Sequence, residues 1–372
     1  MRVLVLGSYA DSIINFRGQL ISDLVTRGAE VFAAAPNLTQ SHWVSRIERL
    51  GARARDVYLQ RSGMNPVKDI VSLWSIWRLL REVKPDIILC YTIKPVLYGA
   101  IAARLLGIKL VFPLITGLGY AFQDKPGFRA RLLKKIVFLL YKVAMKNAHV
   151  VFFQNTDDKE VFISNGLLGK GQKVVVVPGS GVDIRHFEYS VTPINPFRFL
   201  MVARLLKSKG VMEYLEAARK LKKEFPAVQF DLVGWVDDGP DSIDGQEIEQ
   251  LKHEGVINFL GRLEDVRPAL RAASVYVLPS YREGMPRSVL EAMAIGRAII
   301  TTNAPGCRDT VQQMVNGLLV SPRSAVELCN AMRHLINRQD LVVAMGEESR
   351  TMAETTFDVN ITNQLMLETM GL

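Results

Sequence analysis

A strand–loop–helix–strand plan occurs twice in this 372-residue chain, and it limits the possible folds more than any other feature. In each copy an apolar strand precedes a polar loop, an amphipathic helix and a second strand, at residues 2–7, 8–14, 15–26 and 30–35 and at 197–203, 204–209, 211–224 and 229–233. Further apolar runs occur at 87–90, 109–114, 149–153, 173–177, 258–260, 275–278 and 298–302. Such runs separated by helices are typical of parallel strands buried on both faces. The sequence therefore predicts an α/β protein of two doubly wound, Rossmann-like domains, with ligands in a central cleft at the carboxyl ends of the strands.

Glycines and prolines interrupt the pattern around residues 179–196. These residue types end helices and strands, so the domain boundary is expected here. We predict a first domain at residues 1–180, a linker at 181–196, a second domain at 197–350 and a C-terminal helix within 351–372.

The composition excludes several classes of protein. The three cysteines are far apart and form no C-x-x-C pair, and the five histidines form no H-E-x-x-H motif, so we expect no disulfide framework and no metal site. No apolar run approaches the roughly 20 residues that cross a bilayer. We therefore expect no membrane span, no cofactor and a reducing, cytoplasmic location.

The net charge of +9 is unevenly distributed. Residues 1–180 contain 25 Lys and Arg against 12 Asp and Glu, whereas the remainder contains 21 against 25. A basic first half indicates an anionic partner, and composition alone leaves nucleic acid, a membrane surface and phosphate groups open.

The strongest motif follows the predicted strand at residues 275–278 and reads PSYREGMPRSVLEAMAIG. It places Glu283 in a loop and Glu291 eight positions later, one turn into the next helix. A loop carboxylate can accept hydrogen bonds from sugar hydroxyls, and the amides of Gly284 and Met285 suit a polar or anionic group at a helix start.

Both glutamates also have a simpler interpretation. Ser288 and Glu291 have the spacing of a capping box, in which the two side chains bond the free amides of the first helical turn. Glu283 would then be a solvated loop residue.

Basic residues gather before the helix predicted at 211–224, in the segment RLLKSKG at 204–210. Cations at a helix N-terminus oppose the helix dipole, which is unfavourable unless an anion lies among them. A diphosphate would bind Arg204 through two parallel hydrogen bonds and Lys209 as a point charge. The alternative is a hydrated surface loop.

The two motifs, in this order, resemble those of the retaining nucleotide-sugar glycosyltransferases of family 4, which have the GT-B fold. The resemblance covers essentially the whole chain and implies that the C-terminal helix packs on the first domain. It implies that Arg204 and Lys209 hold the donor diphosphate, Glu283 the donor sugar and Glu291 the ribose. The implied donor site comprises Arg204, Lys209, Arg262, Leu263, Glu283, Gly284, Met285, Pro286 and Glu291, with Glu283, Arg204 and Lys209 as the catalytic residues.

Two segments of the first half, CYTIKP at 90–95 and ITGLGYAF at 115–122, each follow a predicted strand and should therefore face the cleft. They resemble segments of bacterial enzymes that extend lipid-linked oligosaccharides, many of them α-1,3-N-acetylgalactosaminyltransferases using UDP-N-acetylgalactosamine. A plain glycine turn is the alternative for the second segment. The resemblance implies a polyprenyl-diphosphate-linked acceptor and acceptor-side residues Asn15, Phe16, Arg17, Tyr91, Lys94, Thr116, Gly117 and Gly119.

Two departures from the family pattern concern the mechanism. Many relatives have a histidine where this chain has Tyr91 or Thr116, and the chain contains no Asp-x-Asp. We therefore expect a metal-independent reaction in which Arg204, Lys209 and helix amides stabilise the leaving group. A front-face displacement, with a donor phosphate oxygen taking the acceptor proton, would retain the anomeric configuration.

One predicted helix is both basic and amphipathic. Its seven basic residues, with no acidic residue among them, are Lys125, Arg129, Arg131, Lys134, Lys135, Lys142 and Lys146. Apolar residues recur at helical spacing at Phe128, Leu132, Ile136, Leu139, Leu140 and Val143. We expect this helix to bind an anionic membrane surface, which makes the protein peripheral on the cytoplasmic face. A core-facing helix with a solvated basic side is the alternative.

Two other functions remain open. A sugar-nucleotide 2-epimerase of the same fold would act on the donor alone. A nucleic-acid-binding protein would explain the basic half, but no aromatic residues alternate with the basic ones, so we expect no nucleic acid partner.

Overall fold

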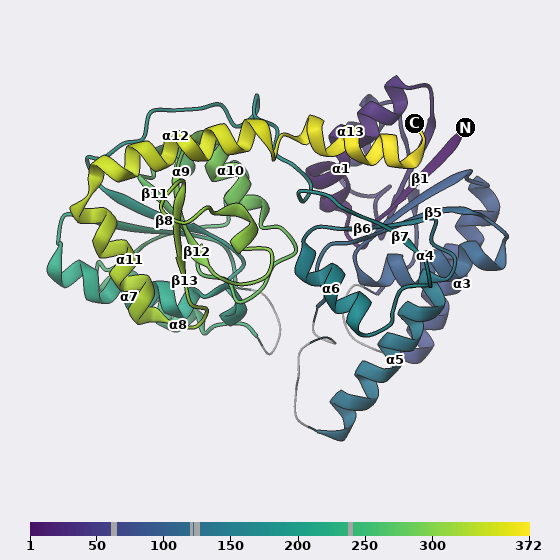
Figure 1. The fold of residues 1–372 in the computed structure, drawn as a ribbon, viewed down its shortest axis with the longest axis horizontal. Coiled ribbons are helices and arrows are strands. Elements are labelled where there is room, and N and C mark those ends of the chain that lie inside the picture. Colours follow the sequence, from purple (N-terminus) through teal and green to yellow (C-terminus); the bar gives the residue numbers. More distant parts are fainter. Residues whose placement is uncertain (61–64, 120–121, 123–126, 237–240) are drawn as a thin grey trace. The chain divides into compact units, whose positions relative to one another are not determined.

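The structure is a computed structural model that describes residues 1–60, 65–119, 122, 127–236 and 241–372. The chain divides into two units (Figure 1): Met1–Ser180 with Thr362–Leu372, and Gly181–Ile361. The second unit therefore includes the predicted linker and runs past the predicted domain end at residue 350. A parallel bridge between Val182 and Asp358 ties its two ends together.

The first unit is built on a seven-stranded parallel sheet with strand order β3-β2-β1-β4-β5-β6-β7. Its strands are β1 (Arg2–Leu6), β2 (Glu30–Ala35), β3 (Arg53–Asp56), β4 (Ile87–Tyr91), β5 (Leu110–Ile115), β6 (Val150–Phe153) and β7 (Lys173–Val176). The chain order reverses between β1 and β4, so the switch point at which such sheets bind ligands lies at the carboxyl ends of these two strands.

Helices cover both faces of this sheet. They are α1 (Ala10–Thr26), α2 (Val44–Arg49), α3 (Pro66–Val83), α4 (Ile93–Leu105), α5 (Phe128–Met145), α6 (Thr156–Ser164) and α13 (Val359–Met370). Buried residues of α3, α4, α5 and α6 form one apolar cluster with the sheet. Those of α1, α2 and α13 form a second cluster, so the last helix completes the core of the first unit (Figure 1).

The second unit has a six-stranded parallel sheet of order β10-β9-β8-β11-β12-β13. The strands are β8 (Arg198–Val202), β9 (Gln229–Val233), β10 (Asn258–Gly261), β11 (Val275–Leu278), β12 (Ala298–Thr302) and β13 (Gly317–Val320). Here the order reverses between β8 and β11. The two predicted motifs follow these two strands and therefore meet at the switch point of this sheet.

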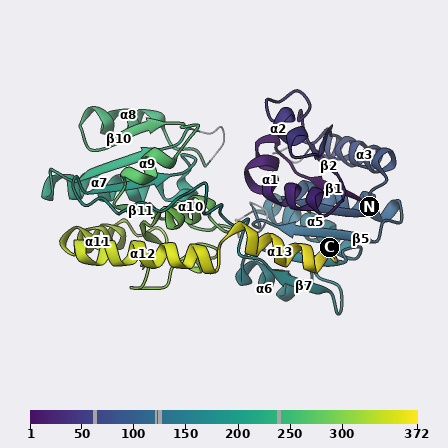
Figure 2. The same cartoon turned by 90° about the horizontal axis from the view of Figure 1, so that it is seen from above.

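The helices of the second unit are α7 (Val211–Glu224), α8 (Gly245–His253), α9 (Arg267–Ala272), α10 (Arg287–Ile295), α11 (Ala325–Asn337) and α12 (Gln339–Thr355), with 3-10 turns η2 (Lys207–Lys209) and η3 (Arg308–Thr310). Helix α7 packs against α11, and α10 packs against α9 and α12. Helices α11 and α12 follow one another along one side of the unit (Figure 2).

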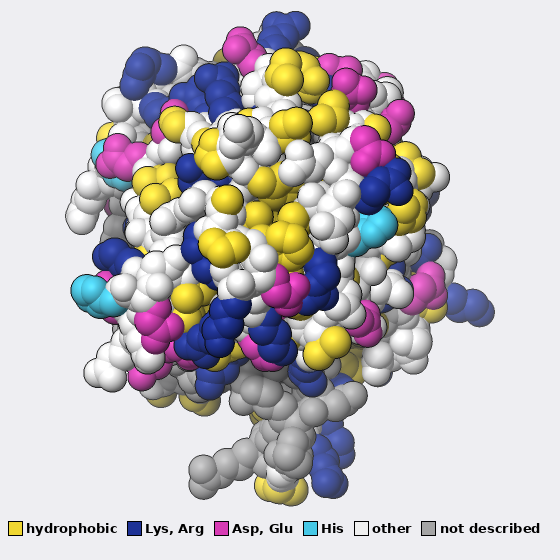
Figure 3. Space-filling view, turned by 90° about the vertical axis from the view of Figure 1, so that its left-hand side faces the viewer, with side chains coloured by type: hydrophobic (Ala, Val, Ile, Leu, Met, Phe, Trp, Pro, Cys, Tyr) yellow, Lys and Arg dark blue, Asp and Glu magenta, His cyan; other side chains and the backbone are white. Residues whose placement is uncertain are grey.

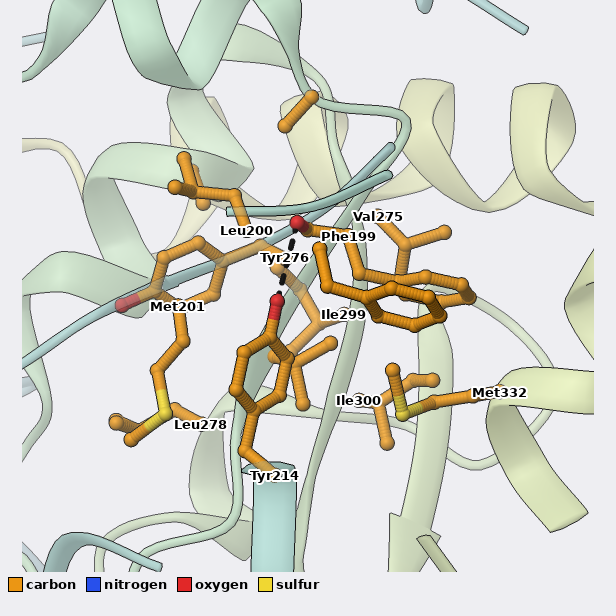
Figure 4. Packing of buried hydrophobic residues seen from close by; sticks show 14 of the residues in the cluster. Phe199, Leu200, Met201, Tyr214, Val275, Tyr276, Leu278, Ile299, Ile300 and Met332 are labelled. Carbon is orange, nitrogen blue, oxygen red and sulfur yellow. Dashed lines mark hydrogen bonds between the residues drawn. The ribbon is translucent and has the colours of Figure 1, made fainter. Parts of the chain in front are cut away.

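A buried tyrosine fixes α7 to the sheet. The Tyr214 hydroxyl donates to the carbonyl oxygen of Phe199 on β8 at 3.1 Å (Figure 4). The same hydroxyl lies 3.0 Å from the carbonyl oxygen of Asp231 on β9. A buried hydroxyl with no partner would destabilise the fold, so these bonds make the position of α7 specific. The start of α7, next to Lys209, is thereby fixed relative to β8.

The structure corrects three sequence-based expectations. The first helix begins at Ala10 rather than at residue 15, and two strands were missed, β3 and β13.

No helix within the described residues is long and apolar enough to span a membrane.

Candidate active site

The loop after β8 lies directly against the segment that follows β11. Gly210 has a φ of 73°, and a Cβ at this position would collide with the carbonyl of Pro279. The backbone amide of Tyr281 donates to the carbonyl oxygen of Ser208 at 2.8 Å. Only glycine allows this close approach, which brings the two predicted motifs together.

Lys209 and Glu283 form an ion pair at the centre of this contact. Their side chains are about one-fifth and one-seventh exposed, at 21% and 14%. The Ser280 hydroxyl lies 2.7 Å from the same Glu283 oxygen, Oε1, and 3.1 Å from the Ser208 carbonyl oxygen. The Glu283 carboxylate is therefore fixed in position by a cation and a hydroxyl, at the carboxyl ends of β8 and β11.

The turn after β12 supports the Glu283 loop from the other side. The amide of Glu283 donates to the Pro305 carbonyl at 3.0 Å. Gly306 has a φ of 76°, and a Cβ there would collide with the carbonyls of Glu283 and Gly284. The Asp309 carboxylate accepts from the Gly306 amide at 3.1 Å. This turn was not predicted to be part of the site, although it follows a predicted strand and therefore lies at the same edge.

A thiol close to Glu283 is not reactive. Cys307 is buried, and its sulfur lies 3.8 Å from the Ser280 carbonyl oxygen. Burial, with the nearby Glu283 charge, raises the pKa of the Cys307 thiol to about 12. The thiol therefore stays protonated near neutral pH and is a poor nucleophile.

Glu291 lies on α10, which begins at Arg287 with Pro286 as its N-cap residue. Ser288 is thus the second helical residue rather than the N-cap, so the capping-box interpretation is wrong. Glu291 Oε1 instead accepts from Arg287 Nε at 2.9 Å. Burial raises the pKa of Glu291, and Arg287 opposes that shift only in part. Gly284 and Met285 connect Glu283 to this helix start.

The remaining predicted donor residues follow β8 and β10. Arg204 is half-buried beside the end of β8. Arg262 directly follows β10, and its guanidinium carbon lies 4.9 Å from the ring centroid of Trp235. Leu263 packs against the apolar core of the second unit.

An aromatic and cationic cluster that the sequence analysis did not find lies beside Glu283. The Tyr281 hydroxyl donates to Glu213 Oε1 at 2.6 Å, and the Arg323 guanidinium lies 4.9 Å from the Tyr281 ring centroid. These residues come from α7, the loop after β11 and the loop after β13. They are close only because the fold places these elements together, so their spacing in the sequence carries no signal.

The predicted residues on helix α1 differ in exposure. Asn15 and Phe16 are exposed, whereas Arg17 is buried with its guanidinium carbon 5.3 Å from the Tyr91 ring centroid. The Tyr91 hydroxyl is hydrogen-bonded to the Ser12 hydroxyl at 2.8 Å. Burial raises the pKa of Tyr91 to about 12, so this hydroxyl is neutral at physiological pH.

The loops after β4 and β5 also lie at the switch-point edge of the first sheet. Lys94 is mostly buried and pairs with Asp69 on α3 at 2.7 Å. Thr116 and Gly117 are half-buried, and Gly119, with a φ of 66°, lies against Ile93. Tyr120, Ala121 and Lys125, which belong to the predicted segments, lie outside the described residues.

Comparison with known proteins identifies the family. Residues 196–338 match the family "Glycosyl transferases group 1", and residues 15–179 match "Glycosyl transferase 4-like domain". A protein from Campylobacter jejuni, N,N'-diacetylbacillosaminyl-diphospho-undecaprenol alpha-1,3-N-acetylgalactosaminyltransferase, is 30% identical, with 99% of this chain and 98% of the relative covered. The chain belongs to the group 1 glycosyltransferases.

Other glycosyltransferases agree with this assignment over much of the chain. The Escherichia coli UDP-Gal:alpha-D-GlcNAc-diphosphoundecaprenol alpha-1,3-galactosyltransferase is 30% identical over 72% of this chain and 70% of its own length. The crystal structure of Anabaena HepE in complex with UDP aligns over the full length of both chains, with a TM-score of 0.78 and 20% identity. The fold is therefore GT-B, with two Rossmann-like domains, as the sequence motifs predicted.

Proposed function

We propose that this glycosyltransferase moves a sugar from a UDP-linked donor to a saccharide carried on polyprenyl diphosphate, as a step in bacterial glycan or polysaccharide synthesis. N-acetylgalactosamine is the proposed sugar, because the C. jejuni relative that spans the whole chain is named for its transfer. Both named relatives are described by diphosphoundecaprenol-linked substrates, which supports this acceptor class. The UDP complex of HepE supports the nucleotide.

The contact between Lys209 and Glu283 is the observation that carries the proposal. It combines a cation suited to a diphosphate with a carboxylate suited to sugar hydroxyls, a few ångströms apart at the switch point of the second sheet. A sugar diphosphate carries these two kinds of group on either side of the bond that breaks. Arg204 adds a second cation for the diphosphate, and Glu291 is the proposed ribose ligand.

The proposed reaction retains the anomeric configuration and uses no metal ion or cofactor. The bond between the anomeric carbon and the diphosphate oxygen breaks while the acceptor hydroxyl oxygen bonds the same face of that carbon. The acceptor proton passes to an oxygen of the departing diphosphate, which leaves as UDP. Lys209 and Arg204 stabilise the charge that develops on the leaving group.

On the acceptor side, exposure separates two proposed roles. Asn15 and Phe16 are exposed and are the proposed acceptor contacts, together with the half-buried Thr116. Arg17, Tyr91 and Lys94 are engaged with other protein groups, so we propose that they hold the acceptor loops in place. Gly117 and Gly119 would let the backbone approach the acceptor closely.

An anionic membrane surface is the proposed source of the acceptor, and helix α5 supports it. Phe128 and Leu139 are 79% and 62% exposed, and Leu132 and Ile136 between them are also exposed. No acidic residue occurs in α5. By contrast, cationic and acidic side chains lie side by side on the molecular face shown in Figure 3. Basic residues beside an apolar stripe are suited to anionic headgroups.

Helix α3, for which no membrane contact was predicted from the sequence, also has a stripe of exposed apolar residues. Val67, Ile70 and Trp74 follow one another at helical spacing and are all more than half exposed. Helices α3 and α5 both pack against α4. The start of α3 is joined to the start of α4 by the ion pair between Asp69 and Lys94. The exposed residues of α3 lie in its first half, close to the edge that holds the proposed acceptor loops. We propose that α3 contributes to the same membrane contact, with the protein peripheral on the cytoplasmic face.

A donor screen tests the proposal. The purified protein is incubated with a polyprenyl-diphosphate-linked saccharide and, separately, UDP-GalNAc, UDP-Gal, UDP-GlcNAc or GDP-mannose, and release of nucleoside diphosphate is measured. We expect UDP release, greatest with UDP-GalNAc, and loss of at least 100-fold in rate for Lys209→Ala and Glu283→Ala, since single charge-stabilising groups contribute about this much.

The matched control is Lys220→Ala, which removes a lysine of α7 that pairs with Glu216 on the solvent side. Its rate should equal that of the wild type. Release from none of the donors would refute the proposal. An epimerised sugar nucleotide formed without acceptor would replace it with the epimerase function.

A further inference from the structure

Trp235 is an exposed aromatic residue at the edge of the second sheet where ligands are expected. It follows the carboxyl end of β9, and 40% of its surface is exposed. The guanidinium of Arg262, from the end of the neighbouring strand β10, lies 4.9 Å from its ring centroid. The family resemblance placed Arg262 in the donor site but gave Trp235 no role.

Backbone hydrogen bonds place Trp235 between Arg262 and the diphosphate-binding loop. The Trp235 carbonyl accepts from the amide of Leu205 at 3.0 Å, next to Arg204. The amide of Gly234 donates to the carbonyl of Gly261 at 2.9 Å, which joins the ends of β9 and β10. The backbone that carries the indole is therefore hydrogen-bonded to the loop after β8 on one side and to the end of β10 on the other.

The strand order then arranges the chemical groups in a line. The carboxyl ends of β10, β9, β8 and β11 follow one another along the sheet edge. They carry, in turn, Arg262, Trp235, the loop with Lys209, and Glu283. A nucleotide sugar has the matching sequence of groups: a flat base, a diphosphate and a polyhydroxylated sugar.

We infer that the Trp235 indole, held by Arg262, is the surface on which the nucleobase of the donor stacks. The inference rests on the proposed nucleotide-sugar donor and adds the residue that holds its base. A large aromatic ring loses little conformational freedom when a cation already fixes it, so stacking costs little entropy. Stacking uses the flat face that every base has, so Trp235 contributes affinity without selecting among bases.

Calorimetric titration with two ligands tests the inference, because inorganic diphosphate lacks a base. We expect Trp235→Ala to weaken UDP and GDP binding by similar factors, roughly 5- to 100-fold, the range that base–aromatic stacking provides. Binding of inorganic diphosphate should stay at the wild-type value. Trp235→Phe keeps an aromatic face and should retain most of the UDP affinity.

A fluorescence measurement gives an independent readout. The other three tryptophans, Trp43, Trp74 and Trp77, all lie in the first unit. Addition of UDP should quench part of the wild-type emission, and the quench should disappear in Trp235→Phe. Trp74→Phe, which replaces another exposed tryptophan, should keep it.

The outcomes separate this inference from the proposed function. If Trp235→Ala binds UDP as the wild type does, or loses inorganic diphosphate and UDP equally, stacking on Trp235 is refuted while the donor proposal stands. If the wild type binds neither UDP, GDP nor inorganic diphosphate, the donor proposal itself fails.

Discussion

The Glu283 carboxylate contacts a lysine ammonium and a serine hydroxyl, so its charge and its hydrogen bonding can be separated experimentally. Glu283→Gln keeps the size of the side chain and an oxygen for the Ser280 hydroxyl, but removes the charge opposite Lys209. We expect kcat to fall roughly 100- to 1,000-fold, as for other groups that stabilise charge in a transition state. The thermal midpoint should change little.

The measurement is UDP release at saturating donor and acceptor, with circular dichroism melting to confirm the fold. Wild-type kcat in Glu283→Gln would mean that the carboxylate charge plays no part in catalysis. The hydrogen-bonding role would then be sufficient.

Glu291 makes a prediction about stability and pH. Burial raises its pKa, so the folded protein binds the proton more tightly than the unfolded chain does. Ionisation of Glu291 therefore destabilises the fold. This cost is absent below the pKa of the unfolded chain, about 4.3, and is complete above the higher pKa of the folded state. The Arg287 pair offsets only part of it.

Glu291→Gln removes this cost, so its thermal midpoint should move upward relative to that of the wild type as the pH rises from about 4 to about 7. Melting curves across this range measure the difference. Glu348→Gln, which removes an exposed glutamate of α12, controls for the loss of one charge and should show no such trend. A difference that moves toward the wild type with rising pH would contradict the prediction.

At the scale of elements, the exposed stripe of α5 predicts membrane binding. Replacing Phe128 and Leu139 together by serine removes two exposed apolar side chains of the helix at no cost to the core. We expect the variant to lose most of its co-flotation with vesicles of phosphatidylglycerol and phosphatidylcholine at low salt.

The matched control is Val326→Ser on α11, which removes a comparably exposed apolar residue of the second unit. It should float as the wild type does, and vesicles of phosphatidylcholine alone should bind neither protein strongly. A wild type that fails to float on anionic vesicles at low salt would refute the membrane contact.

Sequence patterning predicted elements with a clear apolar pattern, such as the apolar strand β11 and the amphipathic helix α7, whose predicted bounds match the structure. Strand β3 was missed because its sequence, RARD, has no apolar run and lies at the sheet edge. Helix α1 begins early because Ser12 and Ile13 are buried by tertiary packing, in a stretch that reads as a polar loop.

The candidate site was predictable to the same extent. Lys209 and Glu283 belong to motifs that follow predicted strands, so their common edge followed from the fold. The contacts of the neighbouring groups could not be predicted, because Gly306, Arg323 and Trp235 lie in separate loops. For Gly306 and Trp235 only the sheet edge was predictable, since each follows a predicted strand. Their proximity depends on strand order, which local sequence does not encode.

At the scale of the whole molecule, each sheet has candidate site residues at the point where its strand order reverses. In the first sheet the Thr92 hydroxyl donates to Ser8 at 2.9 Å across the ends of β4 and β1. In the second, Lys209 meets Glu283 across the ends of β8 and β11. The switch points of the two Rossmann-like domains thus differ, because a pair of hydroxyls bridges the strand ends in the first and an ion pair bridges them in the second.

Because the first unit includes the C-terminal residues, a substitution at the end of the chain should affect the stability of elements at its beginning. The C-terminal helix α13 buries Met366, Leu367 and Met370 in a core cluster with α1 and β1, some 350 residues earlier in the chain. A hydrogen bond also joins α13 to α1, because the Asn363 side-chain amide donates to the Asp23 carboxylate at 2.7 Å. The last eleven residues, 362–372, are therefore part of the first folding unit.

Met366→Ala should consequently destabilise the first unit by about 2–5 kcal/mol, the usual cost of truncating a buried methionine. Hydrogen exchange should speed up in β1, β2 and α1 and stay unchanged in β8–β12, although the substitution lies at the far end of the chain. Met332→Ala, an equally buried methionine of α11 in the core of the second unit, should give the reverse pattern. Each of the two substitutions truncates a methionine in only one of the two cores. Faster hydrogen exchange in the second unit of Met366→Ala would therefore contradict the prediction that the two cores respond independently.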